Sequence, residues 1–366
     1  MKWLIIAGVL ALVVVGFLFF RLPQPIIELR PETIFSIGPV DITNTILTSW
    51  VMVALISLIT ILGTRKLTLV PTGWFQNLFE ALIEGFGNIV NGVAGEQNGR
   101  RFFPVVFILF FYIVFCNWMA LTPLFNVIGT TENVYEHVHH LAADPEHADE
   151  PFEEPEIQGW VMKHGSFNYL PLGEKTEHVK VEIPEHSTNA QAAALMDAEL
   201  EHTLGHPFDE EHETYGLIAP FLRGVNTDLN APLGYAVWSA IFVELWGITA
   251  LGLLTYGSKF FNFKGGPIGI FVGLLELISE FARLISFTFR LFGNIFAGEV
   301  LLFMMSFLVP FVLVDVFYGL ELFVGLIQGF VFAMLTLVFG VMAVSGHGDH
   351  EEGHGDAHHA PAEHHA

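Results

Sequence analysis

The sequence predicts an all-α, multi-span membrane protein with a long helical hairpin near its C-terminus and an irregular insert outside the membrane. Three observations lead to this fold class. Hydrophobic residues make up 52% of the 366 residues and charged residues only 14%, and the mean hydropathy is +0.54, values typical of membrane proteins. Apolar runs reach the length of a membrane span. The net charge of -23 is concentrated in two polar segments, which are expected to face water.

A helix needs about 20 apolar residues to cross roughly 30 Å of hydrocarbon. The runs that meet or approach this length are residues 3–20, 42–62, 102–121, 233–256, 267–308 and 316–344. The first run is either a cleaved signal peptide or a retained anchor, since it lacks a clear cleavage site. The run 267–308 is too long for one perpendicular span, and it holds five ionisable residues.

Basic residues near span ends mark the cytoplasmic side of a membrane. Those that fall on one side if the spans alternate are Lys2, Arg65, Lys66, Arg100, Arg101, Lys259 and Lys264. The segment between Phe125 and Leu229 is then external, and the C-terminal tail is cytoplasmic. Residues 73–93 carry aromatic and aliphatic side chains at helical spacing, which predicts an amphipathic connector along the cytoplasmic interface.

The chain is accordingly expected to have five parts. They are a signal peptide or extra anchor (1–21), the first spans with the connector (22–125), an acidic, histidine-rich external insert (126–225), a channel core with the hairpin (226–345) and a disordered histidine-rich tail (346–366). Within the insert we expect short strands near 159–169 and 178–183 and a helix over 190–204.

Charged residues inside the run 267–308 are the strongest functional signal. They are Glu276, Glu280, Arg283, Arg290 and Glu299. One charge at the centre of a span costs about 2.5 to 3.5 kcal/mol on insertion scales, so several unpaired charges would oppose insertion by on the order of 10 kcal/mol. Water or partner groups must therefore reach these side chains.

A helical count from Arg290 at 100° per residue gathers most of the polar residues on one face. The stripe is about 120° wide and about 27 Å long, and it holds Glu276, Ser279, Glu280, Arg283, Ser286 and Asn294. Glu299 falls on the opposite side, where it is expected to face the returning helix with Glu321 and Gln328. An alternative is that the charges pair with one another, above all Glu280 with Arg283, and only stabilise a bundle.

Arg290 defines what the stripe can do. Its guanidinium stays charged in poorly solvated surroundings, so it cannot relay protons, although it attracts a carboxylate and repels a cation. A fixed positive charge in mid-membrane separates two proton-accessible pockets. An ion that crosses must then travel on a carboxylate supplied by another subunit.

Five sequence segments resemble subunit a of the F-type ATP synthases. They are FRLFGNIFAGE (289–299), TDLNAPL with Asp228 and Asn230, IQGFVFAMLT (327–336), FCNWMALTP (115–123) and VPTGWFQNLFEALIEG (70–85). The resemblance covers roughly residues 40–126 and 226–344. The N-terminal run, the insert and the tail lie outside it.

The resemblance implies a proton-translocating stator subunit of the inner cell membrane, with a slanted hairpin packed against a rotating ring of c subunits and with b-type peripheral stalk subunits as further partners. Arg290 matches the family's essential arginine. Polar positions of the external half-channel are matched by Asn294, Glu299 and Gln328, and an acidic position near the cytoplasmic half-channel is matched by Glu276. Glu321 stands where some relatives carry histidine, and Arg283 where some carry lysine.

Two positions depart from the family pattern. Ala120 stands where some relatives have an acid, so external access is expected to use other groups, and Glu244 has no counterpart. Glu244 either adds to the proton path or is satisfied by a neighbouring helix or by headgroup water. Together with Glu280, Arg283, Asp228 and Asn230 it forms a secondary set of candidate ion-path residues.

Several functions are not expected of this chain. It has no GxxxxGK[ST] loop and no nucleophile motif, so it should neither bind nucleotide nor catalyse a reaction by itself, and no cofactor is expected. The acidic balance argues against nucleic-acid binding. The histidine tracts at 137–140 and 347–365 lack metal-site spacing, so they are expected to be solvated, or to buffer protons near the channel. The rival functions are an ion-coupled secondary transporter and a purely structural membrane anchor.

Overall fold

The computed structural model describes residues 31–38, 40–65, 67–68, 70, 73–122, 124–126, 128–145, 147–152, 155–163, 168–169, 177–260, 266–308 and 312–345. The segment 1–21 and the tail 346–366, for which the sequence makes separate predictions, lie outside the described residues. The description below is therefore restricted to the helices, the insert and the loops that join them.

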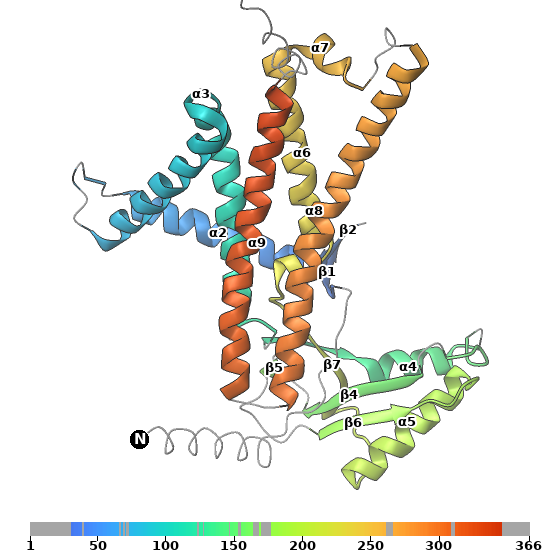
Figure 1. The fold of residues 1–366 in the computed structure, drawn as a ribbon. Coiled ribbons are helices and arrows are strands. Elements are labelled where there is room, and N and C mark those ends of the chain that lie inside the picture. The colour runs from blue at the N-terminus through green and yellow to red at the C-terminus, as the bar shows by residue number, and fades with distance from the viewer. Residues whose placement is uncertain are drawn as a thin grey trace, which may run out of the picture. The chain divides into compact units, whose positions relative to one another are not determined.

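Long apolar helices confirm the predicted fold class. Among the described residues, four helices are long and apolar enough to cross a membrane, namely α2 (Asn44–Thr64), α3 (Trp74–Ala120), α6 (Asn230–Leu251) and residues Val314–Val344 of α9 (Val312–Val344). The helix α8 (Gly266–Leu308) is 43 residues long but carries the five charged residues noted above. α8 and α9 are the two long C-terminal helices that the sequence predicts (Figure 1).

The described residues form two compact parts, which are treated separately. The first part comprises the described residues within Met1–Lys66, Ile113–Ala231 and Leu291–Ile327. The second part comprises the described residues within Leu67–Tyr112, Pro232–Arg290 and Gln328–Ala366. The helices α3, α8 and α9 each contribute residues to both parts.

In the first part, a short β-hairpin precedes α2. Its strands are β1 (Thr33–Ile37) and β2 (Val40–Thr43), which pair antiparallel. The Thr43 hydroxyl accepts a hydrogen bond from the Ile46 backbone N–H at 3.4 Å and so caps the first turn of α2.

The insert is a regular α+β domain, which corrects the expectation of an irregular segment. A five-stranded antiparallel sheet has the order β5-β3-β7-β4-β6. Its strands are β3 (Ile128–Asn133), β4 (Glu156–Lys163), β5 (Asn168–Tyr169), β6 (Glu177–Glu182) and β7 (Glu213–Pro220). The helix α5 (Asn189–Leu204) packs on β6 and α4 (Val134–Ala143) on β7, and the two helices touch each other (Figure 1).

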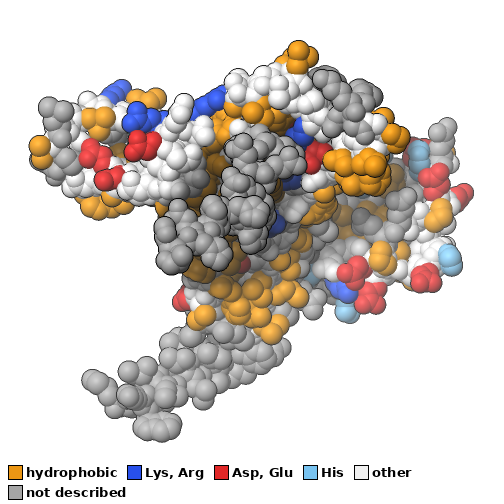
Figure 2. Space-filling view, turned by 45° about the horizontal axis from the view of Figure 1, so that its top comes forward, with side chains coloured by type: hydrophobic (Ala, Val, Ile, Leu, Met, Phe, Trp, Pro, Cys, Tyr) orange, Lys and Arg blue, Asp and Glu red, His pale blue; other side chains and the backbone are white. Residues whose placement is uncertain are grey.

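One hydrophobic core holds this insert domain together. The fully buried side chains of Met196 and Leu200 on α5 meet those of Val179 and Tyr215 on the sheet. The Tyr215 hydroxyl donates to the Val179 carbonyl at 3.0 Å, which satisfies a buried polar group. Acidic and histidine side chains gather on the outside of the insert, at the right of Figure 2. The insert therefore has a hydrophobic core of its own.

In the second part, α3 turns back on itself at Gly95, whose φ of 74° and ψ of 162° are not helical. The predicted amphipathic connector 73–93 is the first arm of this helix. The Phe86 and Phe110 rings stack across the bend with their centroids 4.7 Å apart. Phe110 on the second arm also contacts Phe330 of α9 edge-on at 6.4 Å.

The helices of the second part approach closely where small residues allow it. A Cβ on Gly340 of α9 would lie 2.7 Å from the Trp246 ring of α6, and Trp246 stacks on Phe102 of α3 at 4.2 Å. The buried Ser239 and Thr336 hydroxyls bond each other at 2.8 Å between α6 and α9. After α6, the short helix α7 (Leu253–Gly257) leads the chain back towards α8.

Candidate ion-translocation site

Arg290 is exposed on α8. Its guanidinium donates a long hydrogen bond, 3.5 Å, to the Ser286 hydroxyl one turn earlier. Within the part of the chain that the structure describes, Arg290 forms no ion pair. Asn294, one turn later on the same helix, is exposed as well. Both side chains therefore lie on the exposed surface of α8.

A pocket of about 290 Å³ lies in the first part, between α8, α9 and the chain around the end of α3. Both Glu299 of α8 and Glu321 of α9 line it. The other polar side chains at its wall are Asn117, Thr122, Asn126, Thr227, Ser306 and Tyr318. The structure thus brings Glu299 and Glu321 to one cavity, at the face where the sequence expects Glu299 to meet the returning helix. A cavity of this size and polarity has room for several water molecules.

Glu321 occupies space that only a glycine leaves open. Its side chain is 8% exposed, and a Cβ built on Gly298 of α8 would overlap the Glu321 carboxylate. The glycine of the FAGE motif therefore admits the acid of α9 into the pocket. Gln328, seven residues further along α9, is half-buried and belongs to the second part.

Polar side chains of the FCNWMALTP segment fix the middle of α9 in the first part. Asn117 donates to the Gly325 carbonyl at 3.2 Å and Trp118 to the Leu322 carbonyl at 2.9 Å. Asn226, in the short helix η1 (Val225–Thr227), donates to the Asn117 Oδ1 at 2.7 Å. Donors on consecutive residues of α3 thus hold the turn that follows Glu321.

Asp228 and Asn230 do not line the pocket. Asp228 is 5% exposed, accepts a hydrogen bond from the Thr45 hydroxyl at 2.7 Å and another from the Asn230 backbone N–H at 3.1 Å. A carboxylate with these partners caps the start of α6 and ties it to α2. The geometry favours a structural role for the TDLN segment over a place in an ion path.

A cluster of five charged side chains lies in the second part. Lys259, just after α7, sits 2.6 Å from Glu276 and 3.7 Å from Glu280 on α8. Arg283 pairs with Glu280 one turn earlier, as the alternative reading of the sequence expects, and its guanidinium stacks 4.0 Å above the Phe339 ring. Glu244 of α6 is half-buried and lies within electrostatic range of Glu280, Lys259 and Arg283.

This charged cluster gives charged neighbours to three residues that the sequence proposes for the ion path. Glu280 is held between two cations, Lys259 and Arg283. Glu276, which the sequence places in the polar stripe, is paired with Lys259, a partner that sequence spacing does not reveal. Glu244 is no isolated acid, because it joins the same cluster from a different helix.

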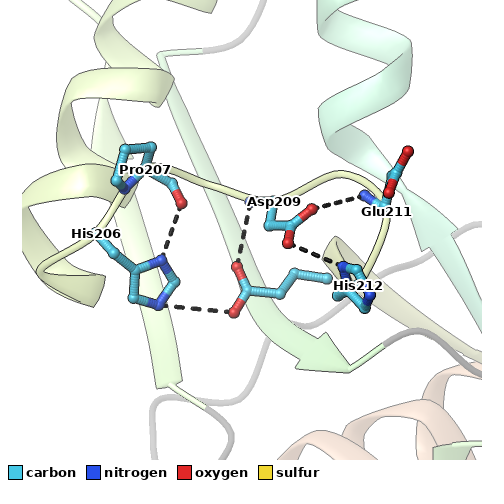
Figure 3. A network of polar contacts seen from close by, with 6 residues as sticks. His206, Pro207, Asp209, Glu211 and His212 are labelled. Carbon is cyan, nitrogen blue, oxygen red and sulfur yellow. Dashed lines mark hydrogen bonds and ion pairs between the residues drawn. The ribbon is translucent and has the colours of Figure 1, made fainter.

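The insert shows histidine–acid pairs rather than a metal centre. The 137–140 tract lies on α4, where His139 Nε2 is 3.0 Å from Asp197 Oδ1 on α5. In the loop between α5 and β7, His212 lies 2.9 Å from Asp209, and His206 lies 3.8 Å from Glu213 (Figure 3). The hydrogen bond with His212 lowers the pKa of Asp209. Nowhere in the described ranges do three or more metal-ligating side chains converge on a point that could hold a metal ion.

Sequence reasoning missed several side chains of the pocket. Asn126 donates from Nδ2 to Glu299 Oε1 at 2.8 Å, and Asn117, Thr227, Ser306 and Tyr318 complete the polar wall. Asn117 belongs to a motif quoted for the resemblance, so its place in a site has a signal in the sequence. Asn126 lies in a loop and carries no such signal.

Comparison with known proteins assigns the family. The family model described as ATP synthase A chain matches residues 46–143 and 195–340. An ATP synthase subunit a of Moorella thermoacetica is 24% identical over 320 residues, covering 87% of this chain and 99% of the relative.

A second ATP synthase subunit a, from Gloeobacter violaceus, is 24% identical over 332 residues, covering 89% of this chain and 96% of the relative. One from Mycobacterium ulcerans is 31% identical over 146 residues, covering 39% of this chain and 56% of the relative. With the helices, the charged α8 and the matched residues in agreement, the chain belongs to the ATP synthase A chain family and is a multi-pass membrane protein.

Proposed function

We propose that this chain is the stator channel of a rotary ATP synthase, in which Arg290 separates two water-filled half-channels and each proton crosses on a carboxylate of a c-subunit ring. The chain itself is non-catalytic, and it works in a complex with the ring and with peripheral stalk subunits. An ion-coupled secondary transporter, the rival function, is not favoured by the family assignment.

The observation that carries the proposal is the order of charged residues along α8, in which Arg290 lies between Glu276 on one side and Glu299 on the other. Arg290 has no acidic partner in the described residues. Glu276 lies fourteen residues before it and Glu299 nine residues after it on the same helix, which corresponds to about 21 Å and about 13 Å along the axis. Each acid belongs to a separate polar cluster. Such spacing supports two access routes that a fixed positive charge keeps apart.

The proposed path begins outside. A proton passes Glu321 and Glu299 in the pocket, with Asn294 and Gln328 as the polar groups nearer the ring, and neutralises a ring carboxylate. A neutral acid tolerates hydrocarbon far better than a carboxylate does, so that ring site then rotates into lipid. The site loses its proton near the cluster of Glu276 and Glu244, and the restored carboxylate is drawn to Arg290.

The sides of the membrane follow in the proposal from the basic residues. The insert faces the external compartment, and the α7–α8 loop with Lys259 faces the cytoplasm, as does the tail. A potential of 100 mV contributes about 2.3 kcal/mol per proton, which gives the ring its direction. Asp228 and Asn230 support the helices and are not placed on the path.

The test replaces Arg290 in the complete complex reconstituted into vesicles. Arg290→Ala is expected to abolish proton-driven ATP synthesis and to leave a passive proton leak, because the two half-channels are no longer separated. Arg290→Lys is the matched control that keeps a positive charge but loses the planar fork; it should block the leak without restoring full synthesis. Normal synthesis by Arg290→Ala would refute the proposal.

A further inference from the structure

Asn126 is a loop residue whose side chain holds an acid of the pocket. Its side-chain Nδ2 donates to Glu299 Oε1 at 2.8 Å, and it lines the pocket together with Glu299. All of these atoms lie in the first part of the chain. The amide donor engages one of the two oxygens of a carboxylate that lines the pocket.

The backbone of Asn126 is set by the stem of the insert. The β3–β7 ladder continues past the strands, since the Phe221 N–H donates to the Ile128 carbonyl at 2.9 Å. The next bond is from the Asn126 N–H to the Leu222 carbonyl, also 2.9 Å. Asn126 itself has a φ of 58°, a left-handed conformation that asparagine tolerates better than most side chains. The backbone hydrogen bonds between the segments that enter and leave the insert therefore fix the position of the Asn126 side chain.

We infer that Asn126 is a positioning residue of the external half-channel, which holds the Glu299 carboxylate at the pocket wall and joins the base of the insert to the ion path. The inference rests on the proposed function of this pocket. An amide does not titrate, so Asn126 orients the acid and does not relay the proton. A carboxylate at this position would instead compete with Glu299 for one proton.

The first test removes the amide without disturbing the backbone. Asn126→Gly keeps the left-handed conformation, since glycine adopts it freely, and deletes only the donor. We expect passive proton conduction to fall by about tenfold, because an ill-placed group slows a positioned reaction steeply. Conduction is measured in vesicles reconstituted with the whole complex and then stripped of its catalytic subunits, which leaves the membrane sector in place. Wild-type conduction by Asn126→Gly at equal assembly would overturn the inference.

The second test places the carboxylate at position 126 and the amide at position 299. In N126D/E299Q the glutamine amide donates to the aspartate, so the hydrogen bond and one carboxylate persist with their roles reversed. This double variant is expected to conduct several times faster than E299Q alone. A residue that merely supports the fold would gain nothing from the exchange, so a double variant no faster than E299Q overturns the inference.

The single variant E299Q separates this inference from the proposed function. If E299Q conducts like the wild type, the pocket is not on the ion path and the proposed function itself fails. If E299Q is impaired while Asn126→Gly conducts normally and the exchange gives no rescue, only the positioning role of Asn126 is lost. The amount of assembled complex in the membrane is measured for every variant.

Discussion

Replacing Gly298 by alanine should slow proton passage through the external pocket with little effect on the stability of the chain. The added methyl group would overlap the Glu321 carboxylate. Because that carboxylate is the far end of a flexible side chain, it can move aside at the cost of a poorer rotamer, about 0.5 to 1.5 kcal/mol. The helices need not separate. What changes is the position of the acid, by on the order of 1 Å, and a misplacement of that size can slow a positioned reaction about a hundredfold.

The assay is proton uptake driven by a potassium diffusion potential, in vesicles reconstituted with the complex and then stripped of its catalytic subunits. Gly298→Ala is expected to reduce the rate between about tenfold and a hundredfold at normal assembly. The matched control is Gly319→Ala on α9, where an added Cβ meets no atom within 4 Å, and its rate should stay near wild type. Combining Gly298→Ala with Glu321→Asp, a shorter acid, should recover part of the rate. The reasoning is refuted if Gly298→Ala conducts as fast as Gly319→Ala.

Three further variants test other contacts. Lys259→Met, which breaks the 2.6 Å pair with Glu276, should lower complex stability by about 1 kcal/mol in thermal unfolding, while Lys259→Arg should not; equal midpoints would contradict this. Tyr215→Phe loses the bond to the Val179 carbonyl and should destabilise the insert by about 1 kcal/mol, seen as faster amide exchange in the sheet. Burial lowers the pKa of His178, so the unfolded state binds the proton first and the stability of the insert falls as pH drops through about 6.5. Between pH 7 and pH 5, His178→Phe should therefore lose less protection of its backbone amides against hydrogen exchange than the wild type. An equal loss would contradict this.

The helical core could be predicted from the sequence because its signals are local. Apolar runs give the spans, and the charges of α8 stand out against them. The pairing of Glu280 with Arg283 follows from their spacing on one helix. The pairing of Glu276 with Lys259 does not, since it joins α8 to the segment after α7 and depends on how the chain returns between the helices.

The insert shows the limit of local patterns. The sequence predicts strands near 159–169 and 178–183 and a helix over 190–204, and β4, β6 and α5 occupy these places. β3 and β7 were not expected, because the polar sequence IGTTEN of β3 resembles a loop and is held in a strand by its neighbours. The tract at 137–140 is expected to be solvated, and His137 and His140 are indeed exposed on α4. The pairing of His139 with Asp197 of α5 has no signal in the local sequence.

The pocket was only partly predictable for the same reason. Glu299 and Glu321 are acids in apolar surroundings, which any reading of the sequence singles out. Asn126 is an ordinary polar loop residue whose importance comes from its left-handed backbone and from the strand pairing beneath it. Neither feature leaves a mark in composition or periodicity.

The way in which the chain leaves for the insert and comes back bears on how such a domain is acquired. The outgoing and returning segments are hydrogen-bonded neighbours, from Ile128 and Phe221 down to Asn126 and Leu222. The chain beyond these two paired segments can be lengthened, shortened or exchanged for a tight turn without moving the ends of the helices that the insert connects. The insert can therefore be replaced, in evolution or by protein engineering, while the paired segments at its base keep the ends of the helices in position.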